Sequence, residues 1–320
     1  MAPQPSDVPT NARMYSDSEG ATTRQPRAPK SCTARAPSTG NASANPGTLR
    51  EFLALGDLSV DEILDDGGGQ RFPLRAREVE ATVLFADMSG FTRRSRDISP
   101  LATLIIANRF VAWLTGEGLR GVPCVIDKYI GDAMMVVFSG QFGSEDHLVD
   151  ALLAARRFAE HDPLDLCPHM GLASGRVAVG YIGTHKRLQC SVFGLPVTLA
   201  ARCASYPIRA DHSASIVLPA DLWRPQSMKL FGPTDYVHVT TGERSQGLPM
   251  WRRLRRRPGR LKHLEEVDVI PVIKHPSRNY LQTVQPNGSL VPTSIELEAE
   301  RTLKELERSG RYKRPVDSDS

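Results

Sequence analysis

The stretch at residues 127–138, DKYIGDAMMVVF, constrains the fold of this chain more than any other part of its sequence. Two apolar runs, at residues 123–126 and 134–138, flank a lysine, a glycine and an aspartate. Short apolar runs bounded by glycine are typical of buried strands, and Gly131 suits a tight turn. The pattern therefore predicts a β-hairpin whose tip carries Asp132. Taken alone, this aspartate is better explained as an ordinary solvated turn residue, which is what most Gly-Asp pairs are.

A second stretch upstream has the same construction. The apolar run at residues 83–85 leads into Asp87, and a loop of small residues at 88–92 follows. If the two strand ends converge, Asp87 and Asp132 can hold a pair of hard cations, because Mg²⁺ and Mn²⁺ prefer oxygen ligands. The loop would offer backbone N–H groups to phosphates ahead of a helix. Together the two stretches indicate the chemistry of phosphoryl displacement.

These blocks, FADMSGFT and DKYIGDAMMVVF, resemble the catalytic domain of class III adenylate/guanylate cyclases. A third block at residues 171–202, with GLASGRVAVGYIG and SVFGLPVTLAAR, resembles the later strands of that family and the helix that bears its transition-state residues. Three blocks in family order are far more specific than a lone glycine motif. The resemblance implies a nucleotidyl cyclase that converts a nucleoside triphosphate, ATP above all, to the 3′,5′-cyclic nucleotide (cAMP) and pyrophosphate for second-messenger signalling.

The resemblance also implies a ligand set for two divalent cations, Mg²⁺ or Mn²⁺. Asp87 and Asp132 are the expected carboxylate ligands, and the Met88 carbonyl is a further candidate. The loop residues expected to contact the substrate are Ser89, Gly90, Phe91 and Thr92.

Two further positions match the family residues that read the base. Lys128 matches the lysine that donates to adenine N1, and Ser191 stands where adenylyl cyclases carry aspartate or threonine. A hydroxyl there can accept from the adenine 6-amino group. Guanylyl cyclases carry glutamate and cysteine instead, so this pair favours ATP over GTP. The alternative is an ordinary exposed strand lysine and a strand-end hydroxyl.

Arg202 matches the arginine that stabilises charge on the transferring phosphate, for which its fixed fork of donors is suited. Thr198 stands where an asparagine is usual in the catalytic helix, and a hydroxyl offers one donor in place of two. Gln246 before Gly247 replaces a phosphate-contacting lysine, with Arg244 as a substitute on the same strand face. These departures leave the rate and the nucleotide open.

Two alternative functions follow from these departures. One is a pyrimidine nucleotide (uridylate or cytidylate) cyclase of a bacterial antiphage, or antiviral defence, system. The other is a catalytically weak nucleotide-binding domain that regulates a partner. Because one chain carries both the metal aspartates and the base-reading and phosphate-reading residues, the resemblance implies a head-to-tail homodimer with two equivalent sites. A downstream effector that binds the cyclic nucleotide is the expected partner of the product.

Helical and strand periodicities alternate along the chain and predict an α+β sheet covered on one face. The resemblance implies a ferredoxin-like βαββαβ core. The expected strands lie at residues 80–87, 123–126 and 134–138, with two more within 170–182 and one ending at 191–192, and the expected helices lie at 100–114, 144–160 and 195–204.

Composition divides the chain into four segments. Residues 1–47, rich in Ser, Thr, Pro, Ala and Arg, are predicted to be disordered, with Met14 as an alternative start, and residues 48–77 form a short helical lead that packs on the core. The resemblance implies a catalytic domain over residues 78–255. Residues 256–320 form a basic and polar extension.

Within this extension, a charged helix is expected over residues 294–311, from Leu297, Leu303 and Leu306, packed peripherally or partly disordered. The basic run at residues 252–262 is expected to be solvated, and no aromatic residues interleave with it as in single-strand nucleic-acid binders.

The remaining features favour a soluble cytoplasmic protein with neither a membrane span nor a nucleic-acid partner. The net charge of the 320 residues is only +4, and the five cysteines have no CxxC spacing, as expected for reduced thiols. A membrane helix needs about 20 apolar residues, and no apolar run in the sequence approaches that length.

Overall fold

The computed structural model describes residues 46–65, 67–96, 98–160, 166–184, 187–208, 214–231, 235–237, 244–246, 251–255, 257–259, 267–274 and 294–313. They belong to a single unit, Ala44–Ser320. The predicted disorder of residues 1–47 and the alternative start at Met14 concern residues that lie almost entirely outside the described ranges.

The helices are α1 (Leu49–Ala54), α2 (Phe91–Arg94), α3 (Pro100–Trp113), the π-helical turn η1 (Leu114–Gly118), the 3₁₀ turns η2 (Gly140–Phe142) and η3 (Ala220–Leu222), α4 (His147–Glu160), α5 (Leu195–Ala204), α6 (Pro225–Leu230) and α7 (Ser294–Arg308). The strands are β1 (Val60–Asp65), β2 (Arg71–Asp87), β3 (Val125–Ile130), β4 (Ala133–Phe138), β5 (His169–Thr184), β6 (Arg187–Phe193), β7 (Ser215–Pro219), β8 (Asp235–Val237), β9 (Arg244–Gln246), β10 (Trp251–Arg253), β11 (Arg257–Gly259) and β12 (Val267–Lys274).

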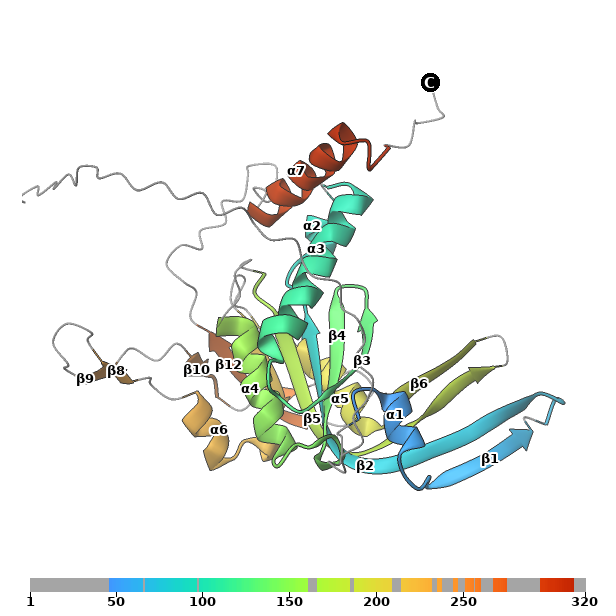
Figure 1. Cartoon of the computed structure of the whole chain (residues 1–320). Helices are drawn as coiled ribbons and strands as arrows, with labels where there is room; N and C mark the ends of the chain where they lie inside the picture. Colours follow the sequence, from blue (N-terminus) through green and yellow to red (C-terminus); the bar gives the residue numbers. More distant parts are fainter. Residues whose placement is uncertain are drawn as a thin grey trace, which may run out of the picture. The chain divides into compact units, whose positions relative to one another are not determined.

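Four antiparallel strands in the order β5-β2-β4-β3 form the centre of the sheet. Helix α3 lies between β2 and β3 in the sequence, and α4 lies between β4 and β5, which gives the order βαββαβ. This arrangement confirms the predicted α+β fold with a ferredoxin-like core. Strand β7 joins β5 in parallel, and β12 and β10 extend the sheet on that side (Figure 1).

Helices cover both faces of this sheet, so the prediction of a sheet covered on one face is wrong. On one face, α3 and α4 cover the sheet (Figure 1). They pack on alternate residues of β2 and β4, such as Leu84 and Val136. On the other face, α1 and α5 pack on the intervening residues, among them Val83 and Val137. Because successive side chains of a strand point to opposite faces, the continuous apolar runs in these strands already required two covered faces.

Helices α3 and α4 begin where their sequences place capping residues. Ser99 accepts a hydrogen bond from the Ala102 N–H at 3.2 Å, and Pro100 occupies the first helical position. Asp146 accepts from Leu148 and Val149 N–H, each at 3.2 Å. The predicted helices are therefore confirmed, with α4 beginning three residues later than residue 144.

The predicted helical lead is half correct. Helix α1 packs on the core, where the Arg77 guanidinium donates to the Phe52 carbonyl at 2.8 Å and lies over its ring. Residues 60–65, however, form strand β1, which pairs with the first half of β2. Gly67 and Gly69, both with positive φ, lie in the turn of this hairpin and do not end a helix.

The sequence prediction also underestimated the length of strand β2, which pairs with both β1 and β4. Strand β2 runs for 17 residues and begins at Arg71, not at residue 80. Residues 170–182 are not two strands but part of one 16-residue strand, β5, because Ser174 and Gly175 continue its pairing with β2. Gly175 has a φ of +147°, an extended but glycine-favoured conformation that does not interrupt the strand.

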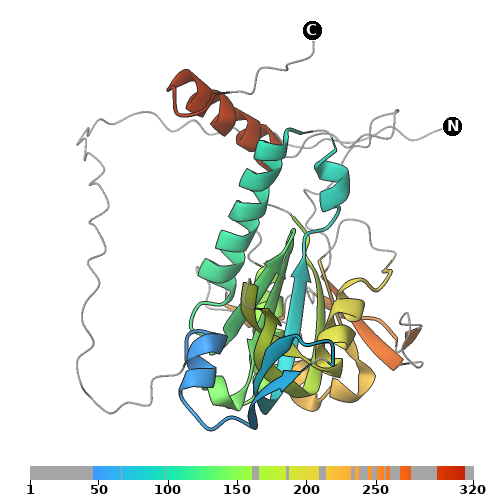
Figure 2. The same cartoon turned by 90° about the vertical axis from the view of Figure 1, so that its right-hand side faces the viewer.

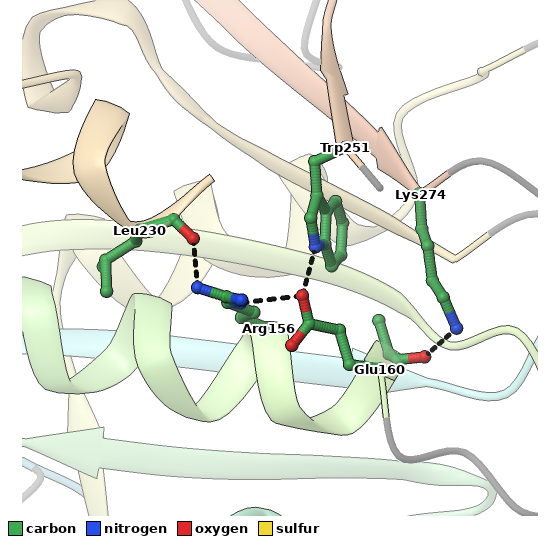
Figure 3. Close-up of polar contacts among 6 residues, drawn as sticks. Arg156, Glu160, Leu230, Trp251 and Lys274 are labelled. Carbon is green, nitrogen blue, oxygen red and sulfur yellow. Dashed lines mark hydrogen bonds and ion pairs between the residues drawn. The ribbon is translucent and has the colours of Figure 1, made fainter. Parts of the chain in front are cut away.

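The sheet continues beyond residue 255. Strand β12 pairs with both β7 and β10, and a polar cluster ties this region to the end of α4 (Figure 3). In the cluster, Glu160 accepts from Arg156 and from the Trp251 indole, each at 2.7 Å, and Lys274 donates to the Ala159 carbonyl at 2.5 Å (Figure 3). The described part of the basic run, expected to be a solvated tail, instead contributes to β10 and β11, although Arg252 and Arg253 remain exposed.

Helix α7 packs against the N-terminal end of α3 (Figure 2). Its buried face carries Ile295, Ala299 and Leu303, whereas the predicted contact residue Leu297 is exposed. A buried ion pair joins Glu296 of α7 to Arg94 at 2.9 Å. The polar helix is thus anchored by one apolar stripe and one buried charge pair.

Candidate active site

Strands β3 and β4 form the hairpin predicted from the glycine turn. Gly131 and Asp132 are its two turn residues, and Gly131 has a φ of +63°. Asp132 does not have a positive φ, so the turn has the II′ pattern, in which glycine is favoured at the first position. Asp132 therefore lies at the hairpin tip, as expected.

The end of strand β2 brings Asp87 next to this tip. In the register between β2 and β4, Asp87 lies opposite Ala133, the residue after Asp132. The two carboxyl groups are hydrogen-bonded, and burial together with the negative charge of Asp87 raises the pKa of Asp132 from 3.8 to about 7. The pair consequently retains a proton up to near-neutral pH when no cation is bound.

The donor set of this pair fits a hard divalent cation. A cation would remove the repulsion between the carboxylates, and their oxygens are the donors that Mg²⁺ and Mn²⁺ prefer. Across the described ranges, no group of three or more His, Cys, Asp and Glu side chains comes together. Mg²⁺ commonly takes one or two carboxylates and completes its shell with water and substrate phosphates, so two aspartates are sufficient.

The loop after Asp87 contains the other predicted contact residues. Met88 is buried and Gly90 is exposed with a φ of +69°, while Phe91 is half-buried and Thr92 exposed. The Ser89 carbonyl accepts from Arg94 Nε at 3.3 Å, which links the loop to the buried Arg94–Glu296 ion pair. Contacts of the Met88 carbonyl with a cation and of this loop with phosphates stay predictions.

Lys128 and Ser191 come together although 63 residues separate them in the sequence. Lys128 lies on β3 and Ser191 on β6, and the Lys128 ammonium donates to the Ser191 hydroxyl at 2.5 Å. Ser191 is fully buried, whereas the Lys128 side chain is 28% exposed. Lys128 and Ser191 thus form one polar site, as they must if both contact the same base.

Asp127 completes this polar site and was not singled out from the sequence. The register of β3 against β4 shifts between Ile126 and Lys128, so Asp127 is the extra residue of a β-bulge. Its side chain is fully buried, and its Oδ2 accepts from Ser191 Oγ at 2.9 Å and lies 3.3 Å from Lys128 Nζ. Burial raises the pKa of Asp127, and the Ser191 hydroxyl and the Lys128 ammonium oppose that rise. The only sequence signal was its place beside Lys128.

Arg202 and Thr198 lie one turn apart on the exposed side of α5, away from the buried Ala200 and Cys203. Among the described residues, no hydrogen bond or ion pair joins either side chain to Lys128 or to the two aspartates. The packing of α5 on β5 depends on Gly171, where an added Cβ would lie 2.0 Å from the Ala200 carbonyl oxygen. The structure thus places Arg202 and Thr198 on a surface that a second molecule could reach.

The remaining predicted residues are only partly described. Arg244 and Gln246 lie in strand β9, which pairs with β8 in a separate two-stranded sheet, and Gly247 lies outside the described residues. Cys190, next to Ser191, is a free thiol whose pKa burial raises to about 11, so it is a poor nucleophile at neutral pH. None of the helices in the described ranges is long and apolar enough to cross a membrane.

Comparison with known sequences finds a family that resembles the part of the chain carrying this site. Residues 75–211 match the family described as the adenylate and guanylate cyclase catalytic domain. An uncharacterized protein of Mycobacterium tuberculosis is 30% identical over 179 residues, which cover 54% of this chain and 32% of that protein. An adenylate cyclase of Anabaena cylindrica is 28% identical over 133 residues, which cover 38% of this chain and 26% of that enzyme. The chain therefore spans about a third or less of these relatives.

Solved structures include similar domains. The adenylyl cyclase CyaB from P. aeruginosa aligns with a TM-score of 0.46 and 19% identity, covering 64% of this chain and 99% of that chain.

Proposed function

Because residues 75–211 match the adenylate and guanylate cyclase catalytic domain family, we propose that the chain is a nucleotidyl cyclase that forms a 3′,5′-cyclic nucleotide and pyrophosphate. The observation that carries the proposal is the convergence of Asp87 and Asp132, with a pKa of about 7 at Asp132. A carboxyl group whose pKa is strongly raised beside a second carboxyl group is a candidate for a functional site. A polar site for a base on β3 and β6 lies in the same chain.

In the proposed reaction, the ribose 3′-oxygen attacks the α-phosphorus of the triphosphate. The new O3′–P bond closes the ring, the bond from the α-phosphorus to the bridging oxygen breaks, and pyrophosphate leaves with that electron pair. The proton of the 3′-hydroxyl passes to solvent or substrate. Asp87 and Asp132 would hold Mg²⁺ or Mn²⁺, which lowers the pKa of the hydroxyl and offsets charge on the polyphosphate when bound.

ATP is the substrate that the polar site favours. Lys128 has N–H groups that can donate to adenine N1, and the Ser191 hydroxyl can accept from the 6-amino group. Arg202 would donate to the transferring phosphate, and Thr198 would supply a single further hydroxyl donor.

The active form is proposed to be a homodimer. Arg202 and Thr198 face away from the buried side of α5, so a partner molecule can present its own Asp87 and Asp132 to them. Two-fold symmetry would then create two identical sites from one sequence. Exposed apolar side chains near these elements, Tyr129, Ile130 and Leu195, are consistent with a surface that a second copy covers.

Two alternative functions are supported by the residue at position 198. Thr198 in place of an asparagine weakens the donor set on α5, which suits a different triphosphate, as in a pyrimidine cyclase of an antiphage system. The same change also suits a domain that binds nucleotide with little turnover. A cytoplasmic location and a downstream effector of the cyclic product remain part of this proposal. So does a catalytic domain over residues 78–255, to which the start of β2 and strand β12 add parts of the same sheet.

The test is product identification. The purified 320-residue chain is incubated with ATP, GTP, CTP or UTP and Mn²⁺, and the products are resolved by mass spectrometry. The proposal expects cyclic AMP and pyrophosphate as the main products, with at least about 100-fold less formed by Asp132→Asn. Dominant cyclic UMP would favour the pyrimidine alternative. Binding of triphosphate without any cyclic product would favour the regulatory domain.

A further inference from the structure

Asp127 sets the hydrogen-bond polarity of the polar site on β3 and β6. An ammonium group only donates, and an ionised carboxylate only accepts. The Ser191 hydroxyl lies between one of each, 2.5 Å from Lys128 Nζ and 2.9 Å from Asp127 Oδ2. It must therefore accept from Lys128 and donate its single proton to Asp127.

This arrangement leaves the site with a defined pattern for a further partner. Ser191 has used its proton and retains one lone pair, so it can only accept. Lys128 donates to Ser191 and faces Asp127 at 3.3 Å, which leaves it one N–H group for another acceptor. The site therefore offers one donor beside one acceptor.

The nucleobases fall into two classes, according to whether their hydrogen-bonding edge complements this donor and acceptor. Adenine and cytosine carry an exocyclic amino donor beside an unprotonated ring nitrogen, which complements an acceptor at Ser191 and a donor at Lys128. Guanine and uracil carry a carbonyl oxygen beside a ring N–H, which is the opposite pattern. A keto base would place its oxygen against an oxygen that has no proton to give, and an unpaired buried polar group is strongly disfavoured.

The burial of Asp127 is better explained by a role in the polar site than by a contribution to stability alone. Its side chain has no exposed surface, and its hydrogen bonds come from Ser191, Lys128 and the Val192 N–H, none of which reaches Oδ1. A buried, incompletely paired carboxylate is costly, and an apolar residue of similar size is often as stable. The bulge that brings Asp127 beside Lys128 interrupts the ladder between β3 and β4, which is a further local cost.

We propose that Asp127 is a positioning and specificity-determining residue, which fixes the Ser191 hydroxyl as an acceptor and so selects amino-bearing bases, ATP and CTP, over keto bases, GTP and UTP. The inference rests on the proposed function, whose base it assigns to a chemical class. It also separates the two pyrimidine options, because it admits cytidylate and excludes uridylate cyclisation.

The test compares bases of matched size. For each variant, kcat/KM is measured for ATP against GTP and for CTP against UTP, and binding of the same triphosphates is measured by displacement of a fluorescent ATP analogue. Wild type is expected to prefer the amino base in both pairs. Asp127→Ala frees the Ser191 proton for a carbonyl oxygen, so both preferences should fall by about 10-fold or more. Asp127→Asn, which keeps the volume and offers both a donor and an acceptor, should give a smaller fall.

Two further variants separate this role from a structural one. Ser191→Asp in the Asp127→Ala background returns an acceptor-only carboxylate beside Lys128, so it should restore the amino-base preference. Val125→Ala shortens a buried side chain of the same strand and should lower all four activities by a similar factor without changing either ratio.

The outcomes distinguish the inference from the function on which it rests. Unchanged ratios in Asp127→Ala, a uniform loss like that of Val125→Ala, or a wild-type preference for GTP or UTP would overturn the inference even if cyclic product forms. Selective binding of ATP and CTP that depends on Asp127, but without cyclic product, would support the inference and overturn the proposed function.

Discussion

At the scale of single residues, the proposed cation site depends on two carboxyl groups, those of Asp87 and Asp132, that the fold brings together. The turn at Gly131 and the register of β2 with β4 leave Asp87 and Asp132 hydrogen-bonded, with a pKa of about 7 at Asp132. A folded protein keeps such a pair only if another requirement outweighs the repulsion, and cation binding is the requirement that its chemistry fits.

Asp132→Asn is expected to lower cyclase activity by at least about 100-fold, because it removes a cation ligand. The fold should remain intact, since the substitution also removes the repulsion with Asp87. Activity, circular dichroism and the shift of Tm on adding Mn²⁺ are the measurements, and that shift should disappear. Glu62→Gln, on an exposed position of β1, is the matched control. Normal activity of a folded Asp132→Asn protein would contradict the assignment.

The pKa of Asp132 also predicts a pH dependence of stability. The folded metal-free protein holds this proton up to about pH 7, whereas the group loses it near 3.8 in the unfolded chain. The resulting stabilisation is complete below the unfolded pKa and is lost as pH rises through about 7. In the presence of EDTA, Tm of wild type should therefore fall relative to Asp132→Asn between these values. Mn²⁺ should raise Tm more at pH 8 than at pH 6, since it binds the ionised pair. If Tm changes with pH in the same way in wild type and Asp132→Asn, the protonation of Asp132 does not contribute to stability as predicted.

At the scale of elements, two packing contacts help to hold parts of the proposed site. Helix α5, which carries Thr198 and Arg202, approaches β5 closely over Gly171. The loop after Asp87 is tied to α7 through Arg94 and its buried partner Glu296.

Gly171→Ala should destabilise the protein by about 3 kcal/mol, because the new methyl group meets the backbone of α5 and cannot be relieved by a side-chain movement. Gly140→Ala is the control, since an added Cβ there has no neighbour within 4 Å. Urea unfolding of both variants measures the difference. Equal midpoints would show that α5 does not pack on β5 as described.

Glu296→Ala leaves Arg94 as a buried charge without this partner and should cost about 3 to 5 kcal/mol. Glu298→Ala removes a neighbouring pair with Arg109 that is largely exposed, with Glu298 at 53%, and should cost less than about 1 kcal/mol. Thermal and urea unfolding compare the two variants. Similar small losses would mean that α7 contributes little to holding the loop.

The sequence predicted those elements whose local signals agree with the fold. The hairpin followed from its apolar runs and Gly131, and α3 and α4 followed from helical periodicity. The strand β1 was missed because it is largely exposed and pairs with an extension of β2, which no local apolar pattern indicates. The bulge at Asp127 was missed because it exists only in the pairing of β3 with β4.

At the scale of the whole molecule, one chain does not bring the predicted site together. Asp87 and Asp132 meet at one place, Lys128 and Ser191 at another, and Arg202 lies on the exposed side of α5. Two-fold pairing of chains is the arrangement that would unite the aspartates of one protomer with the base-reading and phosphate-reading residues of its partner.

Complementation between inactive variants tests this central claim most directly. Asp132→Asn and Arg202→Ala proteins are mixed in equal amounts, exchange of subunits is verified with two affinity tags, and formation of the cyclic nucleotide is measured. Half of the dimers should be mixed, and one of the two sites in each should carry no substitution, so about a quarter of wild-type activity is expected. The matched control combines Asp132→Asn with Asp87→Asn, which alter the same half of the site and should remain inactive together. A mixture of Asp132→Asn and Arg202→Ala that stays inactive despite verified exchange would contradict the shared site.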